Sequence, residues 1–265
     1  MNQLIFTLLC WHFSLTKGVL PKHHLEADRT LIVAHRGLTT KHLENTLSAL
    51  TEAFNVGADG VEFDVQLTRD MVPVVFHDRD ILRLTNVEYN IDDILWNQLR
   101  VLPQKSDRYA REYRISTLLD VLSAMPPNKL INVELKETTA MKGSEGMEKV
   151  VNVLYQFKNR LNLVISSFDP KILAMVHEAD PDLKLGLLVD KEDTLKAYFE
   201  GISVFPYIDY INPHIDLINQ TTSRWIKNLR IKLMLWGHTQ LGQEDKFIAD
   251  GHTALISDVV EALMP

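Results

Sequence analysis

The sequence predicts an α/β fold of the (β/α)8 TIM barrel type, with a small subdomain inserted after the second strand. Two observations predict the barrel: eight short, β-rich apolar runs follow one another from residue 30 onward, and segments with helical spacing separate them. A third observation predicts the inserted subdomain, because a long polar stretch over roughly residues 78–114 interrupts this alternation after the second run.

The eight predicted strands share a high content of Val, Ile, Leu and aromatic residues. They are LIVAH (31–35), VEFDVQL (61–67), LINVELK (130–136), LVISSF (163–168), LKLGLLV (183–189), YINPH (210–214), KLMLWGH (232–238) and ALISD (254–258). Strands that alternate with helices are expected to be parallel, and eight such units in about 230 residues favour a closed barrel over an open sheet.

The segments between the strands carry the spacing of amphipathic helices. In ENTLSALTEAFNVG (44–57), Leu47, Leu50 and Phe54 share one face, and Gly57 lies where a helix would end. The other predicted helices are Ser116–Ala124, MEKVVNVLYQFKNR (147–160), DPKILAMVHEAD (169–180), KEDTLKAYFEG (191–201) and TTSRWIKNLR (221–230).

The second unit is irregular. A further apolar run, VPVVFH (72–77), follows the short turn TRDM (68–71), and the polar stretch 78–114 comes next. We expect this stretch to form a small cap over one face of the barrel. The sequence has no internal repeat and no Pro/Gly-rich linker that would mark a second domain. We therefore expect an N-terminal extension (1–29) followed by one barrel domain (30–265).

Composition excludes several classes of function. A formal net charge of -7 argues against a nucleic-acid-binding protein, which would need clustered Lys and Arg. The single cysteine, Cys10, excludes an internal disulfide framework and a multi-cysteine zinc site. We therefore expect no nucleic-acid partner, and the sequence gives no indication of an oligomeric state.

The N-terminal run LIFTLLCWHF (4–13) is apolar but too short to span a bilayer. A signal peptide would have positive charge before this run and small residues after it, whereas MNQ precedes it and SLTKG follows it. We expect a cytoplasmic protein. Export, or membrane association through residues 4–13, is the alternative, and membrane contact is not favoured.

Acidic residues lie on one face of the second predicted strand. Glu62, Asp64 and Gln66 alternate with the apolar positions, which suits either the wet face of an antiparallel strand or a buried metal site. In a barrel neither face is freely solvated, so these carboxylates need partners. The strand at 130–136 adds Glu134 and Lys136 to the same face.

Three carboxylates from neighbouring strands suit a hard divalent cation such as Mg²⁺ or Ca²⁺. The alternative is a set of salt bridges, with Arg36 or Lys136 as the partner of Glu62 and Asp64, and with Lys136 as a counter-ion for Glu134.

Several short motifs occur in a fixed order along the chain. They are His35-Arg36-Gly37, Glu44-Asn45-Thr46, Gly57-Ala58-Asp59, Val61-Glu62-Phe63-Asp64-Val65 and His77-Asp78. This order and spacing resembles the glycerophosphodiester phosphodiesterase family, whose core pattern is HR, then ExD, then HD. The resemblance extends to Glu134-Leu135-Lys136, Ser166-Ser167-Phe168 and Trp236, and so covers about residues 30–258.

The resemblance implies a (β/α)8 barrel with a subdomain after its second strand, and metal-dependent hydrolysis of glycerophosphodiesters to glycerol 3-phosphate and an alcohol. The site residues that it implies are His35 and His77 as the acid/base pair, Glu62, Asp64 and Glu134 as metal ligands, and Arg36 and Lys136 as phosphate-binding residues. It also implies that Glu44 is either an outer metal ligand or a partner of Arg36. Trp236 either stacks on the glycerol or alcohol moiety or packs in the barrel core.

The sequence departs from the family pattern at a few positions. Leu43 stands where the family usually has Pro, Met71 where it has Gly, and Ser257 where it has Thr. After Trp236, Gly237-His238-Thr239 replaces Thr-Val-Asn. Two alternatives for the function remain: a lysophospholipase D-like phosphodiesterase acting on lysophospholipids, or a barrel that binds phosphate esters without catalysis.

Overall fold

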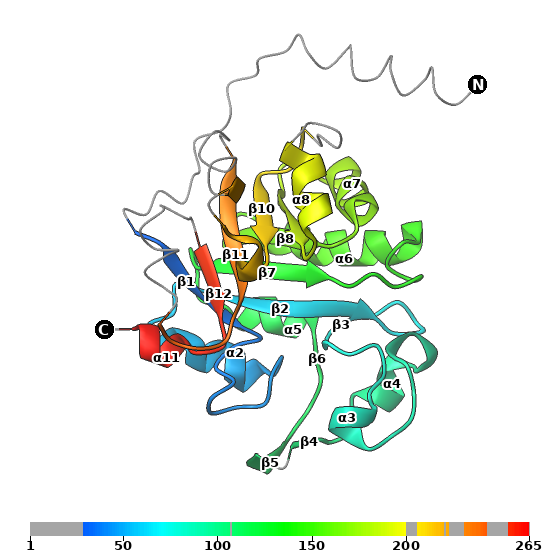
Figure 1. The fold of residues 1–265 in the computed structure, drawn as a ribbon. Coiled ribbons are helices and arrows are strands. Elements are labelled where there is room, and N and C mark those ends of the chain that lie inside the picture. The colour runs from blue at the N-terminus through cyan, green and yellow to red at the C-terminus, as the bar shows by residue number, and fades with distance from the viewer. Residues whose placement is uncertain are drawn as a thin grey trace, which may run out of the picture.

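A computed structural model of the protein describes residues 29–106, 108–199, 206–219, 221–222, 231–242 and 254–264. Eight parallel strands form a closed barrel (Figure 1). They are β1 (Leu31–His35), β2 (Gly60–Leu67), β7 (Leu130–Leu135), β8 (Asn162–Ser167), β9 (Lys184–Val189), β10 (Tyr210–Pro213), β11 (Lys232–His238) and β12 (Ala254–Ser257). The barrel closes because β1 pairs with both β12 and β2. The predicted (β/α)8 barrel is confirmed.

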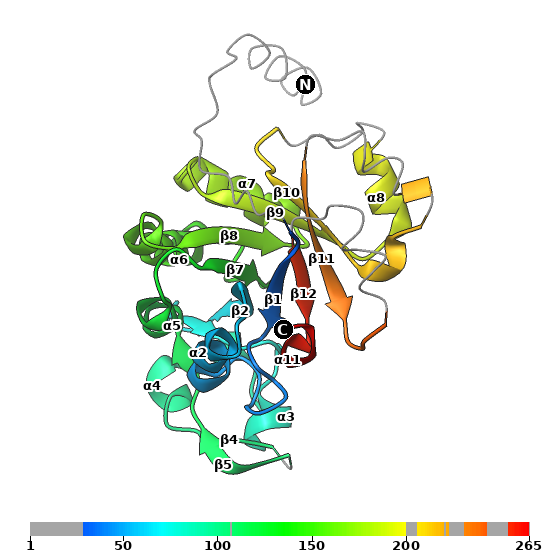
Figure 2. The ribbon, with the colours of Figure 1, turned by 90° about the vertical axis from the view of Figure 1, so that its left-hand side faces the viewer.

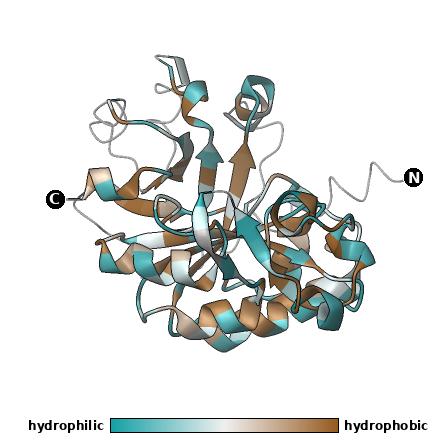
Figure 3. Cartoon of the chain, turned by 90° about the horizontal axis from the view of Figure 1, so that it is seen from below, coloured by the Kyte–Doolittle hydropathy of each residue, from teal (hydrophilic) through white to brown (hydrophobic). Residues whose placement is uncertain are grey.

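Helices cover the outside of the barrel, as Figure 2 shows from a second direction. They are α2 (Leu47–Asn55), α5 (Leu118–Ala124), α6 (Ser144–Phe157), α7 (Pro170–Ala179), α8 (Glu192–Phe199) and α11 (Val260–Leu263). In Figure 3 hydrophobic and hydrophilic stretches alternate along these helices, as amphipathic helices packed on a barrel require. Most of the predicted helix at 221–230 and the N-terminal run at 4–13 lie outside the described residues. Among the described helices, none is long and apolar enough to cross a membrane.

Strand β2 is buried along its whole length. Val61, Phe63, Val65 and Leu67 belong to the main hydrophobic core, together with side chains of the surrounding helices. The opposite face of β2 points into the barrel, where Glu62, Asp64 and Gln66 are also buried. Buried carboxylates are costly unless they are paired or bind a cation, so the interior of the barrel is where a site is expected.

The barrel interior is divided into two layers. The lower layer is an apolar cluster that contains Leu31 and Val33 of β1, Leu130 of β7, Met234 of β11 and other strand residues. Polar side chains lie above it, toward the C-terminal ends of the strands. Barrel enzymes place their sites at this end, because the loops that follow the strands converge there.

A long segment separates β2 from α5. It contains β3 (Pro73–Val75), α3 (Leu82–Thr85), η2 (Ile91–Asp93), α4 (Trp96–Leu99), β4 (Gln104–Ser106), β5 (Tyr109–Tyr113) and β6 (Ser116–Thr117). Strand β3 pairs antiparallel with β2 and β6, and β4 pairs antiparallel with β5. Figure 1 shows most of this segment below β2, on one side of the barrel.

The turn between β2 and β3 is tight. Met71 in this turn has a φ of 58°, in the left-handed region that favours glycine. This conformation explains why the family pattern has Gly at the position of Met71.

Candidate active site

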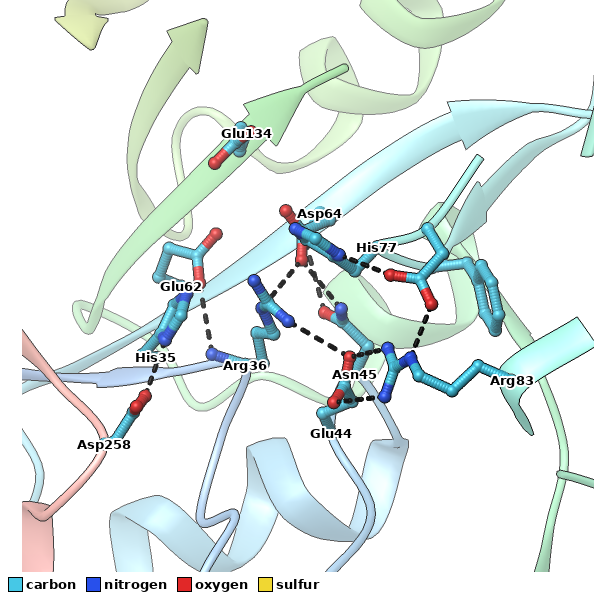
Figure 4. Close-up of polar contacts among 12 residues, drawn as sticks. His35, Arg36, Glu44, Asn45, Glu62, Asp64, His77, Arg83, Glu134 and Asp258 are labelled. Carbon is cyan, nitrogen blue, oxygen red and sulfur yellow. Dashed lines mark hydrogen bonds and ion pairs between the residues drawn. The ribbon is translucent and has the colours of Figure 1, made fainter. Parts of the chain in front are cut away.

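Three carboxylates of β2 and β7 meet inside the barrel (Figure 4). Glu62, Asp64 and Glu134 each offer one oxygen, and these oxygens lie within 4.8 Å of one another. The parallel register produces this arrangement, because Asp64 pairs with Glu134 across the two strands and Glu62 pairs with His35 at the end of β1. The structure thus brings together the three carboxylates that the sequence analysis selected.

The pKa values of the three carboxylates are shifted in different directions. Burial and the neighbouring Asp64 raise the pKa of Glu62 to about 8, and the same two causes raise the pKa of Glu134. Burial also acts to raise the pKa of Asp64, but Lys136 and Arg36 overcome it and hold that pKa below its usual range. The distances are short, since Lys136 Nζ lies 2.8 Å from Asp64 Oδ1 and Arg36 Nε lies 3.3 Å from Asp64 Oδ2.

This carboxylate group is compatible with a hard divalent cation. Glu62 Oε1 is buried and accepts no hydrogen bond from the described residues, a costly state for an oxygen that a cation would satisfy. All the available ligand atoms are carboxylate oxygens, which Mg²⁺ and Ca²⁺ prefer. Lys136 Nζ also lies 2.6 Å from Glu134 Oε1, so one ammonium group contacts two of the three carboxylates.

His35 is oriented by Asp258, which follows β12. His35 Nδ1 and Asp258 Oδ1 are 2.6 Å apart, and His35 Nε2 lies 3.8 Å from Glu62 Oε2. Burial lowers the His35 pKa, but the hydrogen bond to Asp258 and the charge of Glu62 outweigh it, so the net shift is upward. Asp258 has a lowered pKa and accepts as a carboxylate, so Nδ1 is the donor and Nε2 remains for proton transfer.

His77 is oriented in the same way by its neighbour. Its Nδ1 lies 2.7 Å from Asp78 Oδ1. Gln66 of β2 holds the backbone here, because its Nε2 lies 3.0 Å from the carbonyl oxygen of Phe76 and 3.1 Å from that of His77. Burial lowers the pKa of His77, and the positive charges of Lys136 and Arg36 add to this effect against the opposing charge of Asp64.

The loop after β1 contributes Arg36, Glu44 and Asn45. Arg36 and Asn45 have φ values of 54° and 57°, a strained conformation of the kind found at functional sites. Arg36 donates its backbone N–H to Glu62 Oε2 at 3.1 Å and its Nη1 to Glu44 Oε1 at 3.1 Å. Asn45 holds Asp64 through Nδ2 at 2.8 Å. Of the two expectations for Glu44, the geometry matches a partner of Arg36.

Three residues of this network were not predicted from the sequence: Asp258, Arg83, and Asn45 in its role as the partner of Asp64. Asp258 carried a usable signal, because it is a carboxylate at the end of the eighth strand. Arg83 carried none, since it lies in a polar stretch with other Arg residues. Its guanidinium forms two hydrogen bonds to Glu44, at 2.7 and 3.1 Å, and a third to Asp78 at 2.5 Å.

Trp236 lies on β11 and belongs to an aromatic group with Phe168, which follows β8, and His214, which follows β10. Its Nε1 donates to the carbonyl oxygen of Asn212 at 2.9 Å, and its ring centroid lies 5.5 Å from that of Phe168 and 4.6 Å from that of His214. Gly237 makes room for His214, because a Cβ at Gly237 would lie 2.2 Å from His214 Nε2. His238 is buried, with its Nδ1 2.8 Å from Ser257 Oγ.

Comparison with known proteins identifies relatives along almost the whole barrel. The family model described as the glycerophosphoryl diester phosphodiesterase family matches residues 35–262. A protein from Caldanaerobacter subterraneus subsp. tengcongensis, named glycerophosphodiester phosphodiesterase, is 30% identical over 245 residues, which cover 89% of this chain and 97% of that protein.

Solved structures agree with this result. The structure of a phosphodiesterase from Oleispira antarctica, in complex with the product sn-glycerol-3-phosphate, has a TM-score of 0.77 and 26% identity and covers 89% of this chain and 95% of its own. A glycerophosphodiester phosphodiesterase from Thermotoga maritima has a TM-score of 0.71 and 28% identity, with 90% and 98% coverage. The chain belongs to the glycerophosphoryl diester phosphodiesterase family, and it is an enzyme of that class.

Proposed function

We propose that this enzyme hydrolyses glycerophosphodiesters to glycerol 3-phosphate and an alcohol, with a divalent cation, Mg²⁺ or Ca²⁺, held by Glu62, Asp64 and Glu134. The observation that carries the proposal is the pairing of two histidines with aspartates beside a buried group of three carboxylates (Figure 4). The named product of the Oleispira antarctica relative, sn-glycerol-3-phosphate, supports the choice of substrate class.

The proposed chemistry assigns the positive charges to the phosphate. A phosphodiester is anionic and repels a nucleophile, so Arg36 and Lys136 would neutralise its oxygens, Arg36 as a planar fork and Lys136 as a point charge. A bound divalent cation supplies Lewis-acid stabilisation of the charge that develops on the phosphoryl group. Both cationic side chains contact Asp64, which fixes them next to the proposed cation site.

The two histidines are proposed to act as a base and an acid. His77, with its lowered pKa, suits the neutral base that activates the nucleophile through Nε2. His35, with its raised pKa, suits the protonated acid that donates from Nε2 to the leaving alkoxide. In each case the aspartate at Nδ1 fixes the ring and leaves the other nitrogen facing the substrate.

This assignment predicts a shift in the pH profile of Asp258→Asn. The hydrogen bond that His35 donates to Asp258 raises the His35 pKa, so removing the charge of Asp258 lowers that pKa. An acid must be protonated, so the alkaline limb of kcat/KM is expected to move to lower pH, by about one unit for the loss of one charge-assisted hydrogen bond. The acid limb, assigned to His77, is expected to stay in place. The measurement is kcat/KM between about pH 5 and about pH 9.5, which covers the range where ordinary histidines titrate and extends above it for a raised pKa.

Asp182→Asn is the matched control, because Asp182 is 81% exposed and pairs only with Lys158 among the described ion pairs. Its profile is expected to overlay that of the unsubstituted enzyme. An Asp258→Asn profile with both limbs unmoved would remove His35 from the acid role.

The proposed function itself is tested by release of glycerol 3-phosphate from glycerophosphocholine by the purified protein. We expect turnover that EDTA abolishes and Mg²⁺ or Ca²⁺ restores. Turnover of lysophosphatidylcholine without turnover of glycerophosphocholine would favour the lysophospholipase D-like alternative. Binding of glycerol 3-phosphate with no turnover of either substrate would favour a non-catalytic barrel.

A further inference from the structure

We propose that Arg83 is a positioning residue, supplied by the segment between β2 and α5, that fixes His77 and Arg36 in one rigid arrangement. The inference rests on the proposed roles of His77 and Arg36 in hydrolysis. Arg83 lies on the short helix α3 (Leu82–Thr85), outside the sequence motifs that carry the family resemblance.

A continuous line of charged contacts passes through Arg83 (Figure 4). On one side its Nε donates to Asp78 Oδ2 at 2.5 Å, and Asp78 Oδ1 lies 2.7 Å from His77 Nδ1. On the other side its two terminal nitrogens donate to both oxygens of Glu44, and Glu44 Oε1 accepts from Arg36 Nη1 at 3.1 Å. One guanidinium therefore joins the supports of the proposed base and of the proposed phosphate-binding arginine.

The hydrophobic packing explains why these three segments meet. A buried cluster contains Leu43, Phe76, Ile81 and Leu84, with further apolar residues of the inserted segment. Leu43 immediately precedes Glu44, Phe76 immediately precedes His77, and Ile81 and Leu84 lie on either side of Arg83 in the chain. Burial of these apolar side chains brings the carboxylates of Glu44 and Asp78 to the same guanidinium. Leu43, which replaces the Pro of the family pattern, is part of this cluster.

Arg83 influences both the protonation and the orientation of the Glu44 and Asp78 carboxylates. Hydrogen bonds from Arg83 help to hold the pKa values of Glu44 and Asp78 below their usual ranges. Without the guanidinium, the Asp78 carboxylate would keep one side-chain hydrogen-bond partner among the described residues, His77, and would be held less firmly. A general base must keep its accepting nitrogen within hydrogen-bond reach of the substrate. When the orientation of the ring is less fixed, the rate of the catalysed reaction falls. Arg83 itself is 47% exposed, as expected for a residue that acts through others.

The test is the steady-state kinetics of Arg83→Ala with glycerophosphocholine. We expect kcat to fall by about 10- to 100-fold, the range typical of partners that orient a functional side chain, with a smaller change in KM. Arg83→Lys should recover only part of the loss, because an ammonium group cannot form the planar fork to Glu44 and Asp78. Millimolar guanidinium ion in the assay should restore part of the activity of Arg83→Ala and none of that of His77→Ala.

Two controls separate a positioning role from a structural one. Arg79→Ala, a change at a 71% exposed arginine of the same segment, is expected to keep the kcat of the unsubstituted enzyme. In an Asp78→Asn background, Arg83→Ala is expected to cause a smaller loss than in the unsubstituted enzyme, because the Asp78 contact is already lost and only the contacts with Glu44 remain to be removed. Melting temperatures of all variants show whether a loss of kcat reflects unfolding.

The outcomes are distinct. Three results would each overturn the role of Arg83: an unchanged kcat in Arg83→Ala, an equal loss of kcat in Arg79→Ala, or full additivity of Arg83→Ala with Asp78→Asn. The proposed function would still hold in these cases, provided that the unsubstituted enzyme turns over the substrate. No turnover by the unsubstituted enzyme with any added cation would overturn both.

Discussion

The substitution His77→Ala is expected to lower kcat for glycerophosphocholine by about 10²- to 10⁴-fold, the contribution typical of a positioned general base. The expectation follows from the environment of the ring, which is held by Asp78 at Nδ1 and has a lowered pKa, so that it is neutral near pH 7. Because proton transfer occurs only in the transition state, kcat and kcat/KM should fall together with little change in KM. Steady-state kinetics at several pH values would measure this.

His177→Ala is the matched control, since His177 lies near the end of α7 and stacks on Tyr207 with ring centroids 4.7 Å apart, on the outside of the barrel. Its activity is expected to equal that of the unsubstituted enzyme. The double substitution His35→Ala/His77→Ala should be little worse than either alone, because groups that act as a unit are not additive. A His77→Ala enzyme that retains more than about one tenth of the activity would be too active for a missing general base.

The strands were predictable because their signal is local. Each apolar run is short, β-rich and separated from the next by a helical pattern, and such runs need no knowledge of the tertiary structure. The three carboxylates Glu62, Asp64 and Glu134 were predictable for a related reason. Alternation along β2 places Glu62 and Asp64 on one face, and the parallel register with β7 places Glu134 beside Asp64.

Two contacts behind the histidines were not predictable from local spacing: the contact of His35 with Asp258, which depends on how the barrel closes, and that of Arg83 with Glu44, which depends on how the inserted segment packs. His35 meets Asp258 only because β1 and β12 are neighbours, although 223 positions separate the two residues in the chain. Arg83 and Glu44 lie 39 positions apart and meet through packing of the inserted segment. Local spacing does not encode either contact. The motif residues therefore identify the reacting groups, while closure of the barrel and packing of the insertion decide how those groups are oriented.

Removal of the divalent cation is expected to abolish hydrolysis. Glu134→Gln is expected to weaken cation binding by more than about 100-fold. Loss of a residue that only hydrogen-bonds to a metal ligand typically costs about 10- to 100-fold, and loss of a ligand itself should cost more. The amide keeps the size of the side chain but removes a negative charge from a site built of carboxylates. The measurements are activity after dialysis against EDTA, recovery with added Mg²⁺ or Ca²⁺, and calorimetric titration of both proteins. Glu112→Gln, at an exposed glutamate of β5, is the matched control.

The same titration carries a pH signature. In the cation-free protein burial raises the pKa of Glu62 to about 8, so this carboxyl group holds a proton at neutral pH, whereas a ligand must be deprotonated. Binding below pH 8 should therefore release up to one proton, and the affinity should rise with pH, by at most about tenfold per unit, until it levels off above the pKa of Glu62. Calorimetry in two buffers of different ionisation enthalpy counts the released protons. Full activity after exhaustive EDTA treatment, or binding that Glu134→Gln leaves unchanged, would mean that the three carboxylates are held together by Lys136 and Arg36 alone.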